Sequence, residues 1–201
     1  MKVDKWLELF KKNRNKKLFT ISDLIILTGE KPSSLAVQLS RLVKSGIIAH
    51  PVRGWYVNPF QVPSKEEFAM VIRYPSYLSM EYALSKQGIL SQNVFTYTLV
   101  TMKLPYTYRS GDDVFEYHQL KKSLFWGYLK EGVVQIAEPE KAILDLVYIR
   151  IVRGRDMKPS ALGSLIEDMY LEDIDQKRLL QYADRYDKTT RKILSRLIVN
   201  E

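Results

Sequence analysis

Hydrophobic residues recur at helical spacing at the start of the chain. Val3, Trp6, Leu7 and Phe10 fall on one side of a helix, so the pattern predicts an amphipathic helix over residues 3–13. Polar and charged residues fill the other positions of this segment. The first element of the chain is therefore expected to pack one face against a core.

Two more helices follow with a very short connection between them. Thr20 and Asp23 have the spacing of a capping box, and Gly29 suits the position just after the end of a short helix. The next helix begins near Pro32, which is favoured in the first helical turn, and stops before Gly46. The spacing of these signals is typical of a helix-turn-helix.

The helix over residues 32–45 has two contrasting faces. Leu35, Leu39 and Leu42 lie within about 60° of one another and form the expected buried stripe. The other side carries hydroxyls, an amide and cations but no acid, namely Ser33, Ser34, Val37, Gln38, Ser40, Arg41 and Lys44. Ser, Gln and Arg reach base edges and phosphates in a DNA major groove.

A hairpin is expected directly after these helices. Residues 47–50 and 55–57 read as two strands, and residues 51–54 form the turn that presents Arg53 at its tip. Three helices followed by a two-stranded hairpin is the order of a winged helix-turn-helix, in which the hairpin tip reaches a minor groove or a phosphate. We predict such a DNA-binding domain over residues 1–62.

The charge of the chain is concentrated in this first part. Residues 1–62 hold 11 Lys and Arg against 4 Asp and Glu, a net charge of +7 out of the total of +8. Five cations lie within seven residues just before the second helix. The expected DNA-binding residues are Ser33, Ser34, Val37, Gln38, Arg41, Lys44, Arg53, Lys16 and Lys17.

From residue 63 onward the pattern predicts an α+β domain. Short helices are expected over residues 66–72 and 79–86, and four strands over 94–101, 106–109, 114–117 and 133–136. A longer helix over residues 138–153 has too many apolar positions for one stripe, which places it at the centre of a core. Three further helices are expected near 159–169, 174–184 and 188–199. Residues 63–201 are therefore predicted to form a small antiparallel sheet followed by a helical C-terminal section.

Composition excludes several functions. The chain of 201 residues contains no cysteine, so it has no disulfide, no thiolate metal site and no cysteine nucleophile. His50 and His118 lie in different predicted domains, and neither has metal-ligand spacing around it. No apolar run is long enough to cross a membrane, so we expect a soluble, cytoplasmic protein. We also expect no metal and no cofactor.

One enzymatic alternative rests on acidic residues. Asp112 and Asp113, together with Glu138, Glu140 and Asp145, faintly resemble the paired carboxylates that bind Mg²⁺ in a nuclease, with Lys141 close by. In such a site the lysine usually follows one intervening residue after the acid, whereas Lys141 directly follows Glu140. The pattern is better explained as a helix start, and we expect no catalytic residue.

Four strings of residues resemble the AbiEi family, the antitoxin-regulators of type IV abortive-infection toxin–antitoxin operons. They are Leu-Val-Lys-Ser-Gly-Ile-Ile at 42–48 with Arg-Gly-Trp-Tyr at 53–56, Tyr-Leu-Ser-Met-Glu-Tyr-Ala-Leu at 77–84, Leu-Phe-Trp-Gly-Tyr at 124–128 and Ala-Glu-Pro-Glu-Lys-Ala-Ile-Leu-Asp-Leu at 137–146. The last string is the most specific. Together the strings fall within residues 19–150, and nothing diagnostic follows residue 155.

The resemblance implies an autorepressor that binds double-stranded DNA, at inverted repeats upstream of its own operon. It also implies a second domain that counters a nucleotidyltransferase-like toxin without the need for a stable complex. Candidate antitoxin residues are Glu140, Lys141, Asp145, Arg150 and Arg153. A winged-helix transcription factor whose second domain senses a ligand or mediates assembly is the alternative.

Overall fold

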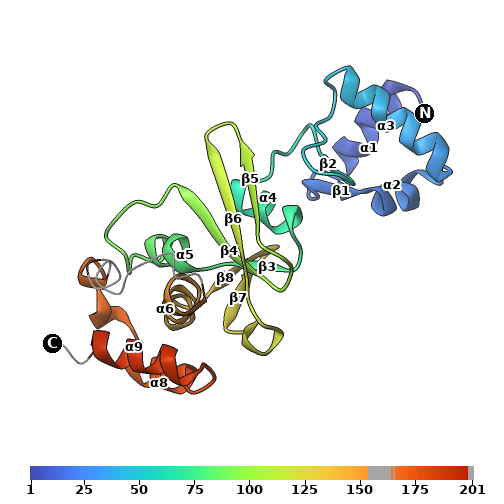
Figure 1. The fold of residues 1–201 in the computed structure, drawn as a ribbon. Helices are drawn as coiled ribbons and strands as arrows, with labels where there is room; N and C mark the ends of the chain where they lie inside the picture. The colour runs from blue at the N-terminus through green and yellow to red at the C-terminus, as the bar shows by residue number, and fades with distance from the viewer. Residues whose placement is uncertain (154–163, 165, 199–201) are drawn as a thin grey trace. The chain divides into compact units, whose positions relative to one another are not determined.

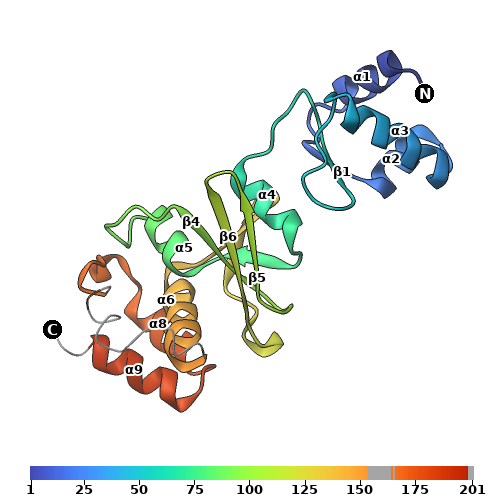
Figure 2. The same ribbon diagram turned by 45° about the horizontal axis from the view of Figure 1, so that its top comes forward.

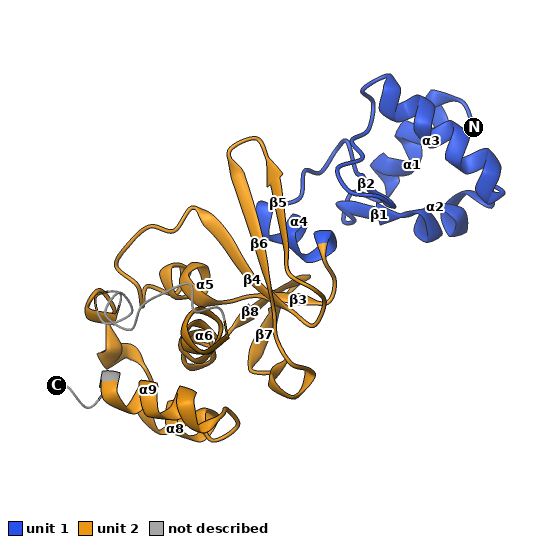
Figure 3. Ribbon diagram, viewed as in Figure 1, with its two compact units in different colours: residues 1–72 blue, residues 73–201 orange. Residues whose placement is uncertain are grey.

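The computed structural model describes residues 1–153, 164 and 166–198 of the chain. It has a mixed α+β fold and divides into two compact units, Met1–Ile72 and Arg73–Glu201 (Figures 1 and 3). The boundary drawn from the sequence after residue 62 precedes this division by one helix. That helix, α4 (Lys65–Ile72), belongs to the first unit.

The first unit contains the three helices expected from the sequence. They are α1 (Val3–Lys12), α2 (Ile21–Thr28) and α3 (Pro32–Lys44). The capping box at the start of α2 is present, since Thr20 and Asp23 bond each other's backbone N–H groups, and Gly29 ends the helix with a φ of 67°. Local sequence signals therefore set where these helices begin and end.

The hairpin expected after α3 is formed only in part: Val52 and Trp55 make an isolated antiparallel bridge, and the Val57 N–H donates to the carbonyl of Ala49 at 2.9 Å. β2 (Trp55–Val57) pairs antiparallel with β1 (Leu18–Thr20), a strand that precedes α2, and the predicted strand at residues 47–50 is not formed. The N–H groups of Ile47 and Ile48 instead donate to the carbonyl of Leu42 and close the end of α3. Backbone groups used in this way cannot also enter a ladder.

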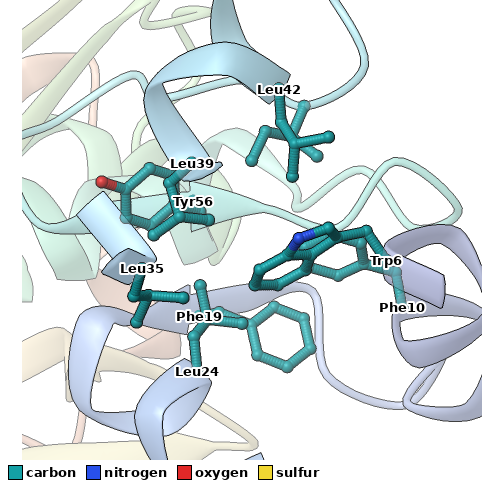
Figure 4. Close-up of a cluster of buried hydrophobic side chains, with 9 residues drawn as sticks. Trp6, Phe10, Phe19, Leu24, Leu35, Leu39, Leu42 and Tyr56 are labelled. Carbon is teal, nitrogen blue, oxygen red and sulfur yellow. The ribbon is translucent and has the colours of Figure 1, made fainter. Parts of the chain in front are cut away.

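The core of the first unit is built from all of these elements (Figure 4). It consists of Trp6, Phe10, Phe19, Leu24, Leu35, Leu39, Leu42, Ile48 and Tyr56. The buried stripe predicted on α3 is thus confirmed. Buried Asn58 links the segment after β2 to the end of α1 and the turn that follows it. Its amide nitrogen donates to the carbonyls of Phe10, Asn13 and Lys16 at 3.2, 3.1 and 2.9 Å.

The second unit is organised around a six-stranded sheet in the order β5-β6-β4-β3-β8-β7. Its strands are β3 (Ser76–Leu78), β4 (Thr96–Thr101), β5 (Tyr106–Ser110), β6 (Asp113–Gln119), β7 (Tyr128–Glu131) and β8 (Val134–Ala137). The sheet is mixed, because β4 pairs parallel with β6 and β3 pairs parallel with β8. The predicted antiparallel sheet is therefore wrong. The prediction lacked β3 and β7, whose three and four residues are too short to show a period.

Two helices, α5 (Met80–Lys86) and α6 (Pro139–Val147), lie on one side of this sheet, as Figure 2 shows. A π-helical segment (Tyr148–Arg153) continues α6, so the predicted helix over 138–153 is confirmed in extent. All side chains of α6 from Glu140 to Val147 are buried, which confirms its predicted central position.

The helical C-terminal section packs beside α6. Both α8 (Gln176–Ala183) and α9 (Lys188–Ile198) contact α6, and the predicted helices near 174–184 and 188–199 are confirmed. Most of the helix predicted near 159–169 lies outside the described residues. Within the part of the chain that the structure describes, no helix is long and apolar enough to cross a lipid bilayer.

Candidate nucleic-acid interface and buried ionic cluster

The outer face of α3 carries most of the residues expected to contact DNA. Ser33, Val37, Arg41 and Lys44 are exposed, because they lie on the side of the helix away from the buried leucines. Val37 is an apolar residue that is 52% exposed in this otherwise polar surface. A valine here could contact a thymine methyl group if the helix entered a major groove.

Ser34 and Gln38 lie at the rim of this face and already have protein partners. The side-chain carbonyl of Gln38 accepts from Trp6 Nε1 at 3.1 Å, and its amide nitrogen donates to the Ser34 hydroxyl at 3.1 Å. The same hydroxyl donates to the Glu30 carboxylate at 2.9 Å. This rim therefore holds an acid that the helical pattern of α3 alone does not reveal.

Lys16 and Lys17 form ion pairs inside the first unit. Lys16 Nζ lies 2.7 Å from Asp23 Oδ1, and Lys17 Nζ lies 2.9 Å from a carboxylate oxygen of Glu67. Burial acts to raise the pKa of the Asp23 carboxyl, but hydrogen bonds from Lys16 and Thr20 outweigh burial and lower it. The positive charge of these two lysines is therefore largely compensated.

Arg53 lies in the turn before β2, where Gly54 has a φ of 85°. It is exposed, as are Arg41 and Lys44 on α3. None of these three side chains forms an ion pair with an acid among the residues that the structure describes. These three cations are the uncompensated positive charge among the predicted contacts, and with Ser33 and Val37 they make the candidate interface.

In the second unit, Lys141 and Asp145 form an ion pair that is completely buried. Successive turns of α6 bring the two side chains together. The Lys141 ammonium donates to the hydroxyls of Tyr77 and Tyr186 at 3.0 and 2.7 Å. Asp145 accepts from Tyr77, Tyr186 and Ser79 at 2.8, 2.8 and 2.9 Å. Every charge in the cluster has several partners.

Burial shifts the titration of this cluster. Burial lowers the pKa of Lys141, and Asp145 opposes that shift. Burial and the charge of Asp145 both hold the pKa values of the Tyr77 and Tyr186 hydroxyls well above the usual range. Near neutral pH both hydroxyls therefore stay protonated and can donate to the carboxylate.

Trp126 and Gly127 complete the surroundings of the Lys141 side chain. The ring centre of Trp126 lies 5.2 Å from Lys141 Nζ. A Cβ at Gly127 would approach Lys141 Cγ to 3.0 Å, and the φ of this residue is +73°. The close approach and the left-handed φ both favour glycine at this position.

The cluster joins residues from three of the strings singled out in the sequence. Tyr77 and Ser79 come from the string at 77–84, Trp126 from 124–128, and Lys141 and Asp145 from 137–146. Residues of these three strings therefore hold the second unit together. No partner can touch Lys141 or Asp145 while the fold is intact, since both side chains are fully buried.

Glu140, another of the candidate antitoxin residues, contacts the helical C-terminal section. One carboxylate oxygen accepts from the Asp175 N–H at 3.1 Å, and the other lies 3.8 Å from Arg178 Nη1. Glu140 thus anchors the start of α8. The adjacent positions 140 and 141 project in different directions, as the sequence argument against a nuclease site expected. The described residues hold no group of three or more His, Asp and Glu side chains that could bind a metal.

Arg150 belongs to a second ionic group on the helix-covered side of the sheet. Its guanidinium donates to both carboxylate oxygens of Glu81 at 2.8 and 3.2 Å and lies 3.9 Å from Glu116. His118 Nε2 lies 3.6 Å from the same Glu116. Burial first, and then the positive charge of Arg150, lower the pKa of His118 below its ordinary value of 6.5. Arg153, in contrast, is exposed.

The basic last helix lines a separate hollow of about 520 Å³. Lys188, Arg191 and Lys192 surround it together with apolar Leu180 and Leu194. Arg191 Nη1 lies 3.4 Å from Asp184 Oδ1, so part of the positive charge of this helix is compensated.

Comparison with known proteins identifies no relative: the chain matches no model of a known protein family, and a search of curated proteins finds no similar sequence.

Replacing one member of the buried pair will strongly destabilise the second unit. We expect Lys141→Met to lower the free energy of unfolding by about 3–5 kcal/mol, because it leaves the Asp145 carboxylate buried without its counter-ion. The double variant Lys141→Met/Asp145→Leu removes both charges and will recover part of that loss. Urea unfolding followed by circular dichroism measures both variants and the single variant Asp145→Leu. A double variant that loses as much stability as Lys141→Met and Asp145→Leu added together would contradict this view of the pair.

His118 will make the stability of the second unit depend on pH. Its folded pKa is lowered, so the unfolded chain binds a proton first as the pH falls below 6.5. This contribution to stability is therefore fully present above pH 6.5 and is lost as the pH falls from there toward the lowered folded pKa. His118→Gln removes the titrating group and will flatten this profile in urea unfolding measured at each pH. Profiles that superimpose for the two proteins would show that His118 is not responsible.

Proposed function

We propose that the first unit is a winged helix-turn-helix that binds double-stranded DNA, with α3 as the recognition helix. Three features support this proposal: α2 and α3 are joined by residues 29–31 only, a small antiparallel sheet closes the unit, and the turn before β2 exposes Arg53. This arrangement would direct the face of α3 opposite the leucine stripe toward a major groove.

The observation that carries the proposal is the pairing state of the cations. Lys16 and Lys17 are bound to acids, whereas Arg41, Lys44 and Arg53 are exposed and have no acidic partner in the described chain. An exposed arginine or lysine without an acidic partner can neutralise a DNA phosphate and release its counterions directly. A paired cation must first break its ion pair, which lowers its net contribution to affinity. The proposed contact surface therefore comprises α3 and the turn that carries Arg53, without Lys16 and Lys17.

We propose further that the protein is an autorepressor and antitoxin of a type IV operon and works in the cytoplasm. It would bind inverted repeats upstream of its own operon and counter a nucleotidyltransferase-like toxin, with no stable complex required. The resemblance of four strings to the AbiEi family supports this half, and side chains of three of them meet in the buried cluster. Exposed residues, rather than Lys141 or Asp145, would then carry the antitoxin activity.

Replacing Arg41 will weaken binding to the upstream DNA. We expect Arg41→Ala to cost roughly 1–3 kcal/mol if the guanidinium contacts a base. Fluorescence anisotropy with the native duplex and a shuffled duplex, over a range of salt concentrations, measures both affinity and specificity. The loss will be larger on the native duplex, because base contacts are sequence-specific and phosphate contacts are not.

The matched control for this experiment is Arg109→Ala. Arg109 is an exposed arginine of β5 in the second unit, so the control removes the same side chain and charge outside the proposed contact surface. It will bind the native duplex like the unmodified protein. Equal binding of the two duplexes, lost together as salt rises, would reduce the first unit to a nonspecific electrostatic anchor.

The antitoxin half predicts a genetic phenotype. If a nucleotidyltransferase-like gene lies beside this one, its expression alone will arrest growth, and co-expression of this chain will restore it. Rescue by a variant carrying both Arg41→Ala and Lys44→Ala would separate toxin antagonism from DNA binding, since both residues belong to the first unit. A neighbouring gene that is harmless when expressed alone would instead favour a transcription factor whose second unit senses a ligand or mediates assembly.

A further inference from the structure

A hollow opens beside the outer face of α3 and is lined by one predicted contact, Lys44, together with residues that were not predicted to contact DNA. Its volume is about 320 Å³, and it is lined by Ala36, Ser40, Val43, Lys44, His50 and Tyr56. All six residues belong to the first unit. Lys44 and Ser40 are exposed positions of α3, whereas His50 and Tyr56 come from the segment that follows the helix.

The His50 ring is held in place by two contacts. It stacks on Tyr56 with ring centres 4.6 Å apart and an angle of 19° between the planes. Its Nε2 accepts from the Gly54 N–H at 3.2 Å. Because Nε2 is used as an acceptor, the proton of the neutral imidazole resides on Nδ1, which is left as a donor.

The hollow offers donors and no negative charge. Lys44 supplies an ammonium, Ser40 a hydroxyl and His50 an imidazole N–H, and none of the lining side chains is acidic. Burial raises the pKa of Tyr56, so its hydroxyl stays protonated and adds a fourth donor. Oxygen atoms of a phosphate accept hydrogen bonds only, which matches this set of groups.

We propose that this hollow binds one backbone phosphate of the DNA, with Lys44 and the Nδ1–H of His50 as its principal ligands. The inference rests on the proposed DNA-binding function and adds His50 and Ser40 to it. A contact of this kind would fix how far α3 enters the groove, because phosphate contacts set register while base contacts set sequence. Stacking on Tyr56 and the bond from Gly54 make the histidine rigid before DNA arrives.

Variants of His50 and Lys44 test the proposal in the full-length chain by fluorescence anisotropy on the upstream duplex. His50→Ala will weaken binding about tenfold, the value of one hydrogen bond to a charged group. His50→Asn, whose amide nitrogen can take the place of Nδ1, will stay within about threefold of the unmodified protein. Lys44→Ala will weaken binding about tenfold and lower the slope of log affinity against log salt by about 1.

Lys12→Ala is the matched control for Lys44→Ala. Lys12 is exposed and already paired with Glu8 at 2.9 Å, so its removal takes away one lysine outside the hollow. Neither affinity nor slope will change appreciably in this control. Circular dichroism of each variant verifies that the first unit remains folded, which is expected since His50 and Lys44 are both exposed.

The outcomes separate this inference from the function beneath it. If the unmodified protein binds the native duplex and Arg41→Ala weakens it, but His50→Ala and Lys44→Ala bind normally, the phosphate site is wrong and the recognition helix stands. If the native and shuffled duplexes bind equally well and none of the variants weakens binding, the proposed function itself fails. A separate arm replaces chloride by inorganic phosphate at constant ionic strength. An NMR shift of His50 on that replacement, combined with unchanged DNA binding by His50→Ala, would assign the hollow to free phosphate and overturn the DNA contact.

Discussion

The second unit depends on the burial of one ion pair. Lys141 and Asp145 have no exposed surface, and a charge removed from water is tolerated only when its counter-ion and hydrogen bonds are all present. Those partners come from β3 through Tyr77, from the residue after β3 through Ser79, and from the segment between α8 and α9 through Tyr186. The pair therefore defines where α6 lies against the sheet and where the C-terminal helices lie against α6.

This constraint bears on which residues of the second unit can recognise a partner. The segments at 77–84, 124–128 and 137–146 contribute Tyr77, Trp126 and Lys141 to the same buried site, so these residues serve the folding of the second unit. Such residues identify a fold more reliably than a partner, because a partner can contact only what is exposed. Recognition by the second unit must therefore be sought among its exposed residues, just as the cations proposed to contact DNA in the first unit, such as Lys44 and Arg53, are exposed.

Much of the fold was predictable because its signals are local. The capping box of Thr20 with Asp23 and the leucine stripe of α3 lie within a few turns of sequence, and both are confirmed. The mixed sheet was not predictable, since β3 and β7 have no period and parallel pairing joins segments far apart. The candidate site has the same limit: the Lys17–Glu67 pair spans 50 residues, and the composition of the basic turn does not reveal it.

Net charge consequently overstates what the first unit can offer to DNA. Of its positive side chains, Lys12, Lys16 and Lys17 meet acids within 3 Å, and those acids compete with any phosphate for the same ammonium groups. Arg41 and Lys44 face no such competition, and α3 holds them at a fixed separation on one rigid surface. Because the backbone of α3 is already folded, binding would order only the two side chains, so they can define orientation as well as attraction. The placement of charge on α3, rather than its amount in the chain, is what would make recognition specific.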